Sequence, residues 1–169
     1  MLFVALVALI CFERFLELGL ARRNRRWMLA QGAQEFGAAH YPCFFILHAS
    51  WLVGWVTEAI LRGLMLDLFW CIWLALFLIA QGLRYWCLIS LGRYWNTRIL
   101  VIPGFKRVSR GPYLFLRHPN YLAVAVELAC VPLIYGAWLT AVLATVFNAW
   151  LLLRKRIPAE EEALKHLAR

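Results

Sequence analysis

The chain has 169 residues, of which 64% are hydrophobic and only 16% are charged, and its formal net charge is +9. Soluble domains contain roughly 45–50% apolar residues, and a small globular core cannot hide such an excess, so the composition excludes an ordinary soluble protein. In a membrane protein, Lys and Arg collect in cytoplasmic loops and near anionic headgroups, so the positive charge does not require a nucleic-acid partner.

Five segments come near the length of about 20 mostly apolar residues that a helix needs to cross a bilayer core. They are 2–21, 42–61, 68–88, 121–135 and 138–153. The first segment has neither the basic start nor the small-residue cleavage site of a signal peptide, so we expect it to be retained. The predicted fold class is an all-α integral membrane protein with about five transmembrane helices in a single domain, 1–169.

Two further features complete the predicted arrangement. Residues 22–40 are polar and then mixed, which is typical of an interfacial helix. The last two spans are short and are separated by little more than Gly136, so we expect them to form a tight helical hairpin.

Lys and Arg are distributed unevenly among the connecting segments. Four arginines lie within 21–27, several more lie in the loop 92–118, and RKR begins the tail 154–169. The positive-inside rule therefore places the N-terminus outside, and both long loops and the tail on the cytoplasmic side.

The five cysteines lie in apolar runs and include no C-x-x-C pair, so we expect neither structural disulfides nor a metal site. Charged residues inside the predicted spans are more informative. Glu13, Glu17, Arg84 and Glu127 are candidate functional groups, because intramembrane ionisable residues usually face the bundle interior. The alternative is structural, with carboxylates paired to arginines and Arg84 reaching the interface.

The stretch RGPYLFLRHPNYLAV, residues 110–124, is rigid, polar and aromatic where it meets the fourth span. Pro119 disfavours the α region for His118 and is itself favoured at the first helical position. His118 is therefore predicted at or near the N-cap, with Asn120 and Tyr121 in the first turn. The free N–H groups of such a helix end suit a carboxylate or phosphate.

Gly111 and Pro112 force a turn upstream and bring Tyr113 to the same neighbourhood. A simple membrane entry explains the same stretch, with tyrosine in the aromatic belt and arginine on headgroups. The hairpin adds a second observation. It must place the start of the fourth span beside the end of the fifth, where Arg156, Glu160 and Glu161 follow. Two polar clusters are therefore expected to meet at the cytoplasmic face.

The motif R-H-P-N-Y (117–121), followed by a short hairpin and R-I-P-A-E-E-E-A-L (156–164), resembles the isoprenylcysteine carboxyl methyltransferase family. The segments H-Y-P (40–42) and L-G-R-Y-W-N-T-R (91–98) are similar to its compact bacterial branch, which includes O-methyltransferases of long-chain alkylpyrones and alkylresorcinols. The resemblance implies S-adenosylmethionine as cofactor and a location in the bacterial inner membrane with the active site on the cytoplasmic face.

The resemblance also implies roles for individual residues. The implied cofactor-binding residues are Phe105, Lys106, Arg107, Val108, Tyr113, His118, Pro119, Asn120, Tyr121 and Glu160. Arg156 is implied near the methyl acceptor, and Arg156, Glu161 and Glu127 are the candidate catalytic residues. Pro158 interrupts a stretch that is usually helical in the family, so the choice between Glu160 and Glu161 for the cofactor stays open.

These residues suit methyl transfer to oxygen. Glu160 or Glu161 can take an ammonium group or a ribose, and the tyrosines can stack on adenine or lie over a sulfonium. A carboxylate acceptor needs only a cation such as Arg156, and an acidic enol or phenol of a long-chain polyketide needs little more. The expected partners are a lipophilic or prenylated acceptor and membrane lipid.

Two other functions remain as alternatives. One is an NADPH-dependent membrane reductase of the sterol-reductase type, whose C-terminal hairpin is distantly similar. The other is a small non-enzymatic transporter or assembly factor, although transporters usually carry repeats and helices interrupted at mid-membrane. The dinucleotide pattern G-x-G-x-x-G is absent from the sequence.

Overall fold

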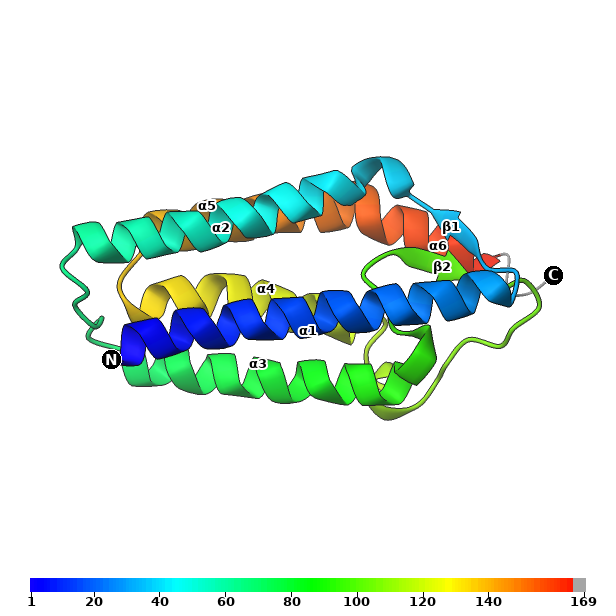
Figure 1. The fold of residues 1–169 in the computed structure, drawn as a ribbon, viewed down its shortest axis with the longest axis horizontal. Helices are drawn as coiled ribbons and strands as arrows, with labels where there is room; N and C mark the ends of the chain where they lie inside the picture. The colour runs from blue at the N-terminus through cyan, green and yellow to red at the C-terminus, as the bar shows by residue number, and fades with distance from the viewer. Residues whose placement is uncertain (166–169) are drawn as a thin grey trace.

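The computed structural model describes residues 1–165, so the last four residues of the predicted tail, 166–169, lie outside the described part of the chain. The fold is mostly helical, as predicted. The helices are α1 (Leu2–Ala30), α2 (Tyr41–Leu61), α3 (Trp70–Leu91), α4 (Pro119–Ile134), α5 (Trp138–Leu151) and α6 (Ile157–Lys165). Figure 1 shows α1 to α5 lying along the long axis, with α2 beside α5 and with α1, α3 and α4 below them.

The centre of the bundle is apolar and closely packed. Ile10, Trp55, Phe77 and Leu128 are almost completely buried and belong to one cluster shared by α1, α2, α3 and α4. The buried indole of Trp51 donates a 2.9 Å hydrogen bond to the carbonyl oxygen of Leu128. Buried side chains of this size supply most of the packing energy of a helical bundle.

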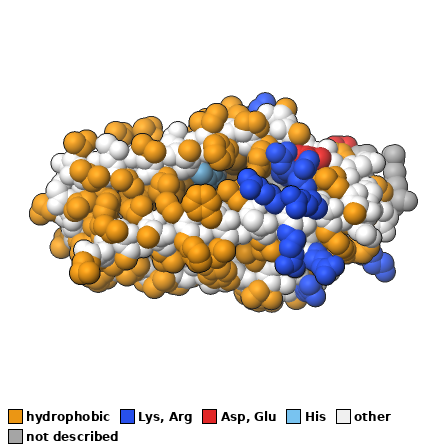
Figure 2. Space-filling model, in the orientation of Figure 1, with side chains coloured by type: hydrophobic (Ala, Val, Ile, Leu, Met, Phe, Trp, Pro, Cys, Tyr) orange, Lys and Arg blue, Asp and Glu red, His pale blue; other side chains and the backbone are white. Residues whose placement is uncertain are grey.

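The outer surface is apolar over most of its length. Figure 2 shows hydrophobic side chains covering this face, with Lys and Arg gathered in a band towards the end that carries α6 and the two strands. Two segments, Ala38–Leu61 and Trp70–Tyr94, are long and apolar enough to cross a membrane, and Pro119–Ile134 is a shorter apolar helix. This pattern indicates a membrane protein, whereas five crossings remain a prediction.

The first helix is longer than expected. α1 continues without a break from Leu2 to Ala30, so the arginine-rich residues extend the first helix and do not start a separate interfacial helix within 22–40. The prediction of that helix was wrong, because residues 21–30 contain no Gly or Pro and consist largely of good helix formers. Buried Asn24 fastens this extension by donating 2.7 Å to the carbonyl oxygen of Trp95.

A short antiparallel sheet follows, which the sequence analysis did not predict. β1 (Gln34–Phe36) pairs with β2 (Ile99–Val101), so two long loops are clipped together beside α6. Glu35 binds two arginines across this clip, Arg25 at 3.1 Å and Arg98 at a shorter distance. Burial opposes the charge of Glu35, but the two arginines outweigh this effect and lower the pKa of its carboxyl.

The Glu35 clip should make stability depend on pH. A pKa that is lower in the folded protein than in the unfolded chain means that the stabilisation is complete above the unfolded value, roughly 4.3, and is lost as the pH falls through the folded value. Because both arginines are partly exposed, we expect Glu35→Gln to cost only about 0.5–1 kcal/mol at pH 7. Thermal unfolding in detergent from pH 7 to pH 3 measures this, and the difference between Glu35→Gln and wild type should shrink in acid. A difference that grows in acid would contradict the assignment.

The predicted hairpin of α4 and α5 is confirmed. Gly136 at the connection has φ +64°, in the left-handed region that glycine adopts without strain. Glu58 of α2 binds the start of α5, accepting hydrogen bonds from the backbone N–H groups of Leu139 at 3.1 Å and Thr140 at 2.9 Å. This carboxylate at the N-terminus of α5 has a structural role, because it binds free N–H groups of the helix.

The helical path continues beyond α5 through a π-helical turn, Leu152–Arg156, directly into α6. Pro158 is the second residue of α6 and has no N–H to offer the preceding turn. A π turn in a continuous helix changes the angular position of all later residues. The π turn therefore sets the side of the helix on which the side chains of Arg156 and Glu160 lie.

Candidate functional site

The polar stretch 110–124, which we call the elbow, lies at the start of α4, as predicted. His118 is the N-cap residue, with φ −133° and ψ 57°, and Pro119 is the first residue of the helix. The His118 ring stacks on the Tyr121 ring, with centroids 5.3 Å apart and planes 9° apart. One turn of helix thus presents two parallel rings on one face.

The tail returns to this elbow, which confirms the predicted meeting of the two clusters. The Nε–H of Arg156 donates to the Tyr121 hydroxyl at 3.0 Å. The Tyr121 hydroxyl in turn donates to a carboxylate oxygen of Glu160, and the same oxygen lies 3.6 Å from Nδ1 of His118. Two side chains of the elbow and two of the tail, about 35 to 42 residues apart in the sequence, therefore form one connected group.

The two tail glutamates have different surroundings. Glu160 joins the group above and lines the main cavity, whereas Glu161 is exposed and borders a smaller hollow beside Arg107 and Arg117. Burial of Glu160 disfavours its charged form. The nearby His118 ring, the hydrogen bond from Tyr121 and the charge of Arg156 outweigh that effect and hold the pKa of Glu160 below its usual value.

The cavity behind this group has a volume of about 580 Å³ and reaches from the elbow into the bundle. Nine of the ten predicted cofactor residues line it, namely Phe105, Lys106, Arg107, Val108, Tyr113, His118, Asn120, Tyr121 and Glu160. Pro119 is buried but is absent from the wall, so its part is to start the helix. Burial raises the pKa of Tyr113, and its hydroxyl stays protonated at neutral pH.

Some polar atoms of the wall have no partner. Oδ1 of Asn120 and Nε1 of Trp95 are both buried, and neither makes a hydrogen bond with any residue of the described part of the chain. Both side chains line the cavity. Buried polar groups are normally satisfied, so an unused acceptor and an unused donor in one cavity wall are typical of a ligand site.

Sequence reasoning assigned no role to the residues that hold Arg156 in place. The Nη2–H of Arg156 donates 3.0 Å to the carbonyl oxygen of Thr97. The Thr97 hydroxyl lies 3.3 Å from the hydroxyl of Tyr41, and the Arg98 guanidinium covers the Tyr41 ring at 4.0 Å. Tyr41 belongs to the segment H-Y-P, and Thr97 and Arg98 belong to L-G-R-Y-W-N-T-R, which the sequence offered only as part of the family resemblance. These two motifs were the signal that could have identified this support.

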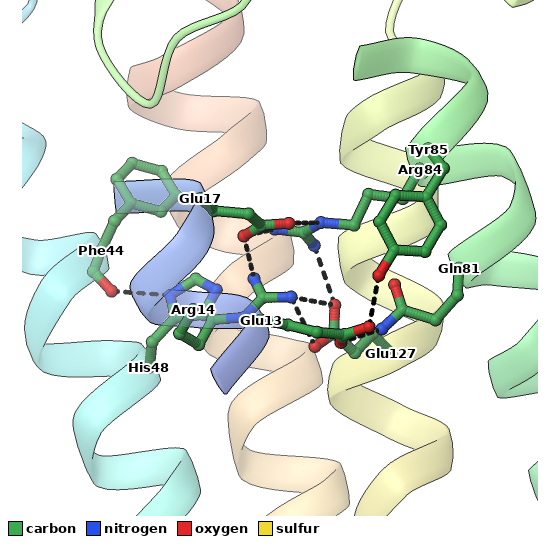
Figure 3. Close-up of polar contacts among 9 residues, drawn as sticks. All are labelled: Glu13, Arg14, Glu17, Phe44, His48, Gln81, Arg84, Tyr85 and Glu127. Carbon is green, nitrogen blue, oxygen red and sulfur yellow. Dashed lines mark hydrogen bonds and ion pairs between the residues drawn. The ribbon is translucent and has the colours of Figure 1, made fainter. Parts of the chain in front are cut away.

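Glu127, a candidate catalytic residue, lies deeper in the bundle. It binds two arginines, Arg14 at 3.0 and 3.2 Å and Arg84 at 2.8 Å, and it does not line the cavity. Arg84 also binds Glu17 through both carboxylate oxygens, and Arg14 lies 3.0 Å from the same residue. Figure 3 shows these side chains converging from three helices.

Glu13, one residue before Arg14, contacts other side chains. It accepts 2.5 Å hydrogen bonds from the Gln81 amide and from the Tyr85 hydroxyl. We call the side chains of Arg14, Glu17, Arg84 and Glu127 the buried charge cluster. The carboxylates of the cluster pair with its arginines, as the structural alternative expected.

Comparison with known proteins gives two kinds of match. The sequence model of the isoprenylcysteine carboxyl methyltransferase (ICMT) family matches residues 73–166. The uncharacterized protein YpbQ of Bacillus subtilis is 41% identical over 164 residues, which cover 97% of this chain and 97% of that protein. An uncharacterized protein of Haemophilus influenzae is 28% identical over 99% of this chain and 98% of its own length. No solved structure matches the chain significantly.

Proposed function

The chain belongs to the isoprenylcysteine carboxyl methyltransferase family, and from this premise we propose that it uses S-adenosylmethionine to methylate an oxygen atom of a lipophilic acceptor. The proposed acceptor group is a carboxylate of the isoprenylcysteine type or an acidic enol or phenol on a long chain. The reaction is placed at the cytoplasmic face of the bacterial inner membrane, where the basic band and the elbow lie at the same end of the bundle. Membership of a methyltransferase family favours this function over the reductase and transporter alternatives.

The observation that carries the proposal is the connected group of His118, Tyr121, Arg156 and Glu160 at the mouth of an elongated cavity. A volume of about 580 Å³ falls within the usual range of roughly 300–1,000 Å³ for small-molecule sites. The mouth is polar, whereas Phe44, Leu52 and Val124 line the wall further in. A polar cofactor and an apolar acceptor chain therefore have separate regions of one cavity.

The residues at the mouth fit the chemical groups of S-adenosylmethionine. Glu160 is a charged acceptor for an ammonium group or ribose hydroxyls, and Lys106 and Arg107 offer positive charge to a carboxylate. The unused oxygen of Asn120 can accept from an adenine amine, and Phe105 offers a ring face. When bound, S-adenosylmethionine supplies an electrophilic methyl group on a sulfonium sulfur.

Arg156 lies between the polar mouth of the cavity and its apolar inner region. Its side chain is buried, its Nε and Nη2 atoms are fixed by Tyr121 and Thr97, and its guanidinium carbon lies 5.9 Å from the centre of the Phe44 ring. A fixed buried cation can orient an acceptor oxygen and stabilise its negative charge. Since methyl transfer is an in-line displacement, holding the acceptor in this position is the main task of the protein.

The function is tested by incubating the purified protein with S-adenosylmethionine labelled on its methyl group and a lipid extract of the source bacterium. A labelled lipid should form, and mass spectrometry should locate the new methyl group on oxygen. The proposal fails if the protein binds NADPH in a thermal-shift assay while S-adenosylmethionine has no effect and no lipid is labelled.

Glu160 and Glu161 provide a matched pair for testing the cofactor site. We expect Glu160→Gln to weaken binding of S-adenosylhomocysteine by about 30-fold, which corresponds to about 2 kcal/mol for one charge-assisted hydrogen bond. Glu161→Gln, which removes the same charge from an exposed neighbour, should change the affinity less than threefold. Isothermal calorimetry in detergent measures both values. The opposite order would transfer the cofactor contact to Glu161.

A further inference from the structure

Two uncharged oxygen atoms hold the guanidinium of Arg156 at the border between the polar mouth and the apolar inner region. Nε donates to the Tyr121 hydroxyl and Nη2 donates to the carbonyl oxygen of Thr97, each at 3.0 Å. A hydrogen bond depends steeply on direction, so the places of these two oxygens set the direction of the remaining N–H groups. Tyr121 is held by α4, whereas Thr97 lies in a bend outside any helix or strand.

Side chains fix the bend that carries Thr97. Buried Asn24 of α1 donates 2.7 Å to the carbonyl oxygen of Trp95. The amide of Asn96 donates 3.0 Å to the carbonyl oxygen of Ala21, which also belongs to α1. Both contacts hold the start of the bend against α1. Its other side, which lines the main cavity, requires a support of its own.

Tyr41 supplies the support on the cavity side. It is the first residue of α2, and its hydroxyl lies 3.3 Å from the hydroxyl of Thr97. The Arg98 guanidinium covers the Tyr41 ring at 4.0 Å, within the range of a cation–π contact. Arg98 is in turn paired with Glu35 of β1. The ring of Tyr41 is therefore fixed by Arg98, and its hydroxyl is directed at Thr97.

The place of Tyr41 connects it with the acceptor region and not only with the fold. Tyr41, Thr97 and Arg156 all line the main cavity. The family model begins at residue 73, so Tyr41 lies outside the part of the chain that the family pattern describes. A chain of contacts thus runs from α2 through Thr97 to the cation that is proposed to orient the acceptor.

We propose that Tyr41 is a positioning residue for the acceptor site. Its hydroxyl fixes Thr97, and the carbonyl oxygen of Thr97 sets the direction in which the Arg156 guanidinium meets the acceptor oxygen. Tyr41 acts through Arg156 and makes no contact with the transferred methyl group. The proposal rests on the proposed function, and it gives the first half of the chain a part in the acceptor site.

Tyr41→Phe removes only the hydroxyl and keeps the ring under Arg98. We expect kcat for the acceptor to fall about tenfold, since a displaced guanidinium orients the acceptor oxygen less well. Binding of S-adenosylhomocysteine should stay within about twofold of wild type, because His118 and Glu160 keep their contacts. A variant that loses cofactor affinity and kcat in the same proportion would overturn the proposal.

Substitutions of Thr97 test the middle of the chain of contacts. Thr97→Val removes the hydroxyl and should lower kcat about as much as Tyr41→Phe, whereas Thr97→Ser keeps the hydroxyl and should stay within about twofold of wild type. Tyr41→Phe and Thr97→Val combined should be no worse than either alone. Losses that multiply in the double variant would show that the two hydroxyls act separately and would contradict the proposal.

A second cycle tests whether Tyr41 acts through Arg156. In an Arg156→Met background, Tyr41→Phe should change the residual rate less than about twofold, because no guanidinium is left to position. A general loss of folding would lower the rate by the same factor in both backgrounds. An equal tenfold loss in both would therefore overturn the positioning role.

A measurement without turnover follows Arg156 directly. In the full chain labelled with 15N-arginine and held in detergent micelles, NMR detects the Nε–H of Arg156, which is assigned by its absence from Arg156→Met. We expect this hydrogen to exchange with water at least about fivefold faster in Tyr41→Phe than in wild type. Tyr85→Phe is the control, because it removes a hydroxyl that contacts Glu13 and does not line the cavity. Unchanged exchange in Tyr41→Phe would refute the proposal.

The outcomes also distinguish this inference from the proposed function. Faster exchange at Arg156 in Tyr41→Phe, without methyl transfer to any lipid by wild type, would retain the control of Arg156 by Tyr41 and refute the methyltransferase proposal. Methyl transfer by Tyr41→Phe at the wild-type rate would retain the methyltransferase and refute the positioning role.

Discussion

Replacing Arg84 by methionine should destabilise the protein by about 3–5 kcal/mol, the usual cost of removing one partner from a buried ion pair. Arg84 is 5% exposed and binds Glu17 through two atoms and Glu127 at 2.8 Å. Without it, Glu17 and Glu127 share the single cation of Arg14. The remaining charges must then be protonated, hydrated or separated, and each of these changes favours unfolding.

Unfolding of the variant in mixed detergent micelles measures this loss. Arg23→Met is the matched control, because Arg23 is exposed on α1 and its loss should cost less than about 0.5 kcal/mol. A double variant, Glu17→Gln with Arg84→Met, should recover part of the stability, because it removes one carboxylate and leaves Glu127 paired with Arg14. If Arg84→Met unfolds like wild type, the carboxylates do not depend on this arginine.

Replacing Arg156 by methionine should reduce methyl transfer about 10²–10³-fold, which corresponds to roughly 3–4 kcal/mol of transition-state stabilisation. The reason is its place between the polar mouth and the apolar part of the cavity, where Tyr121 and Thr97 fix its guanidinium. Binding of S-adenosylhomocysteine should change less than it does in Glu160→Gln, because Glu160 keeps its contacts with Tyr121 and His118.

Initial rates with the labelled cofactor and the acceptor recovered from the lipid extract give the effect on turnover, and calorimetry gives the effect on cofactor binding. Arg154→Met removes the same charge from an exposed position two residues earlier, and its rate should stay within threefold of wild type. A comparable loss of activity in both variants would indicate that the positive charge of the tail matters, and not the position of Arg156.

Local sequence signals predicted much of the helical framework. Pro119 fixed the start of α4 and made His118 its N-cap, and Gly136 marked the connection of the hairpin. These features depend on backbone sterics within a few residues, which a sequence displays directly. The same reasoning ended the first helix too early, because a change from apolar to charged residues alters the surroundings of a helix without breaking its hydrogen bonds.

The sequence by itself determined a mostly helical, membrane-type chain whose elbow and tail would meet, because a short hairpin brings its two ends together. Only the tertiary structure decided the orientation of the tail, since the π turn at Leu152–Arg156 sets which glutamate faces the cavity. It also decided that Glu127 pairs with Arg14 and Arg84. Such contacts join residues tens of positions apart, and they depend on the rotation and depth of packed helices, which no local pattern specifies.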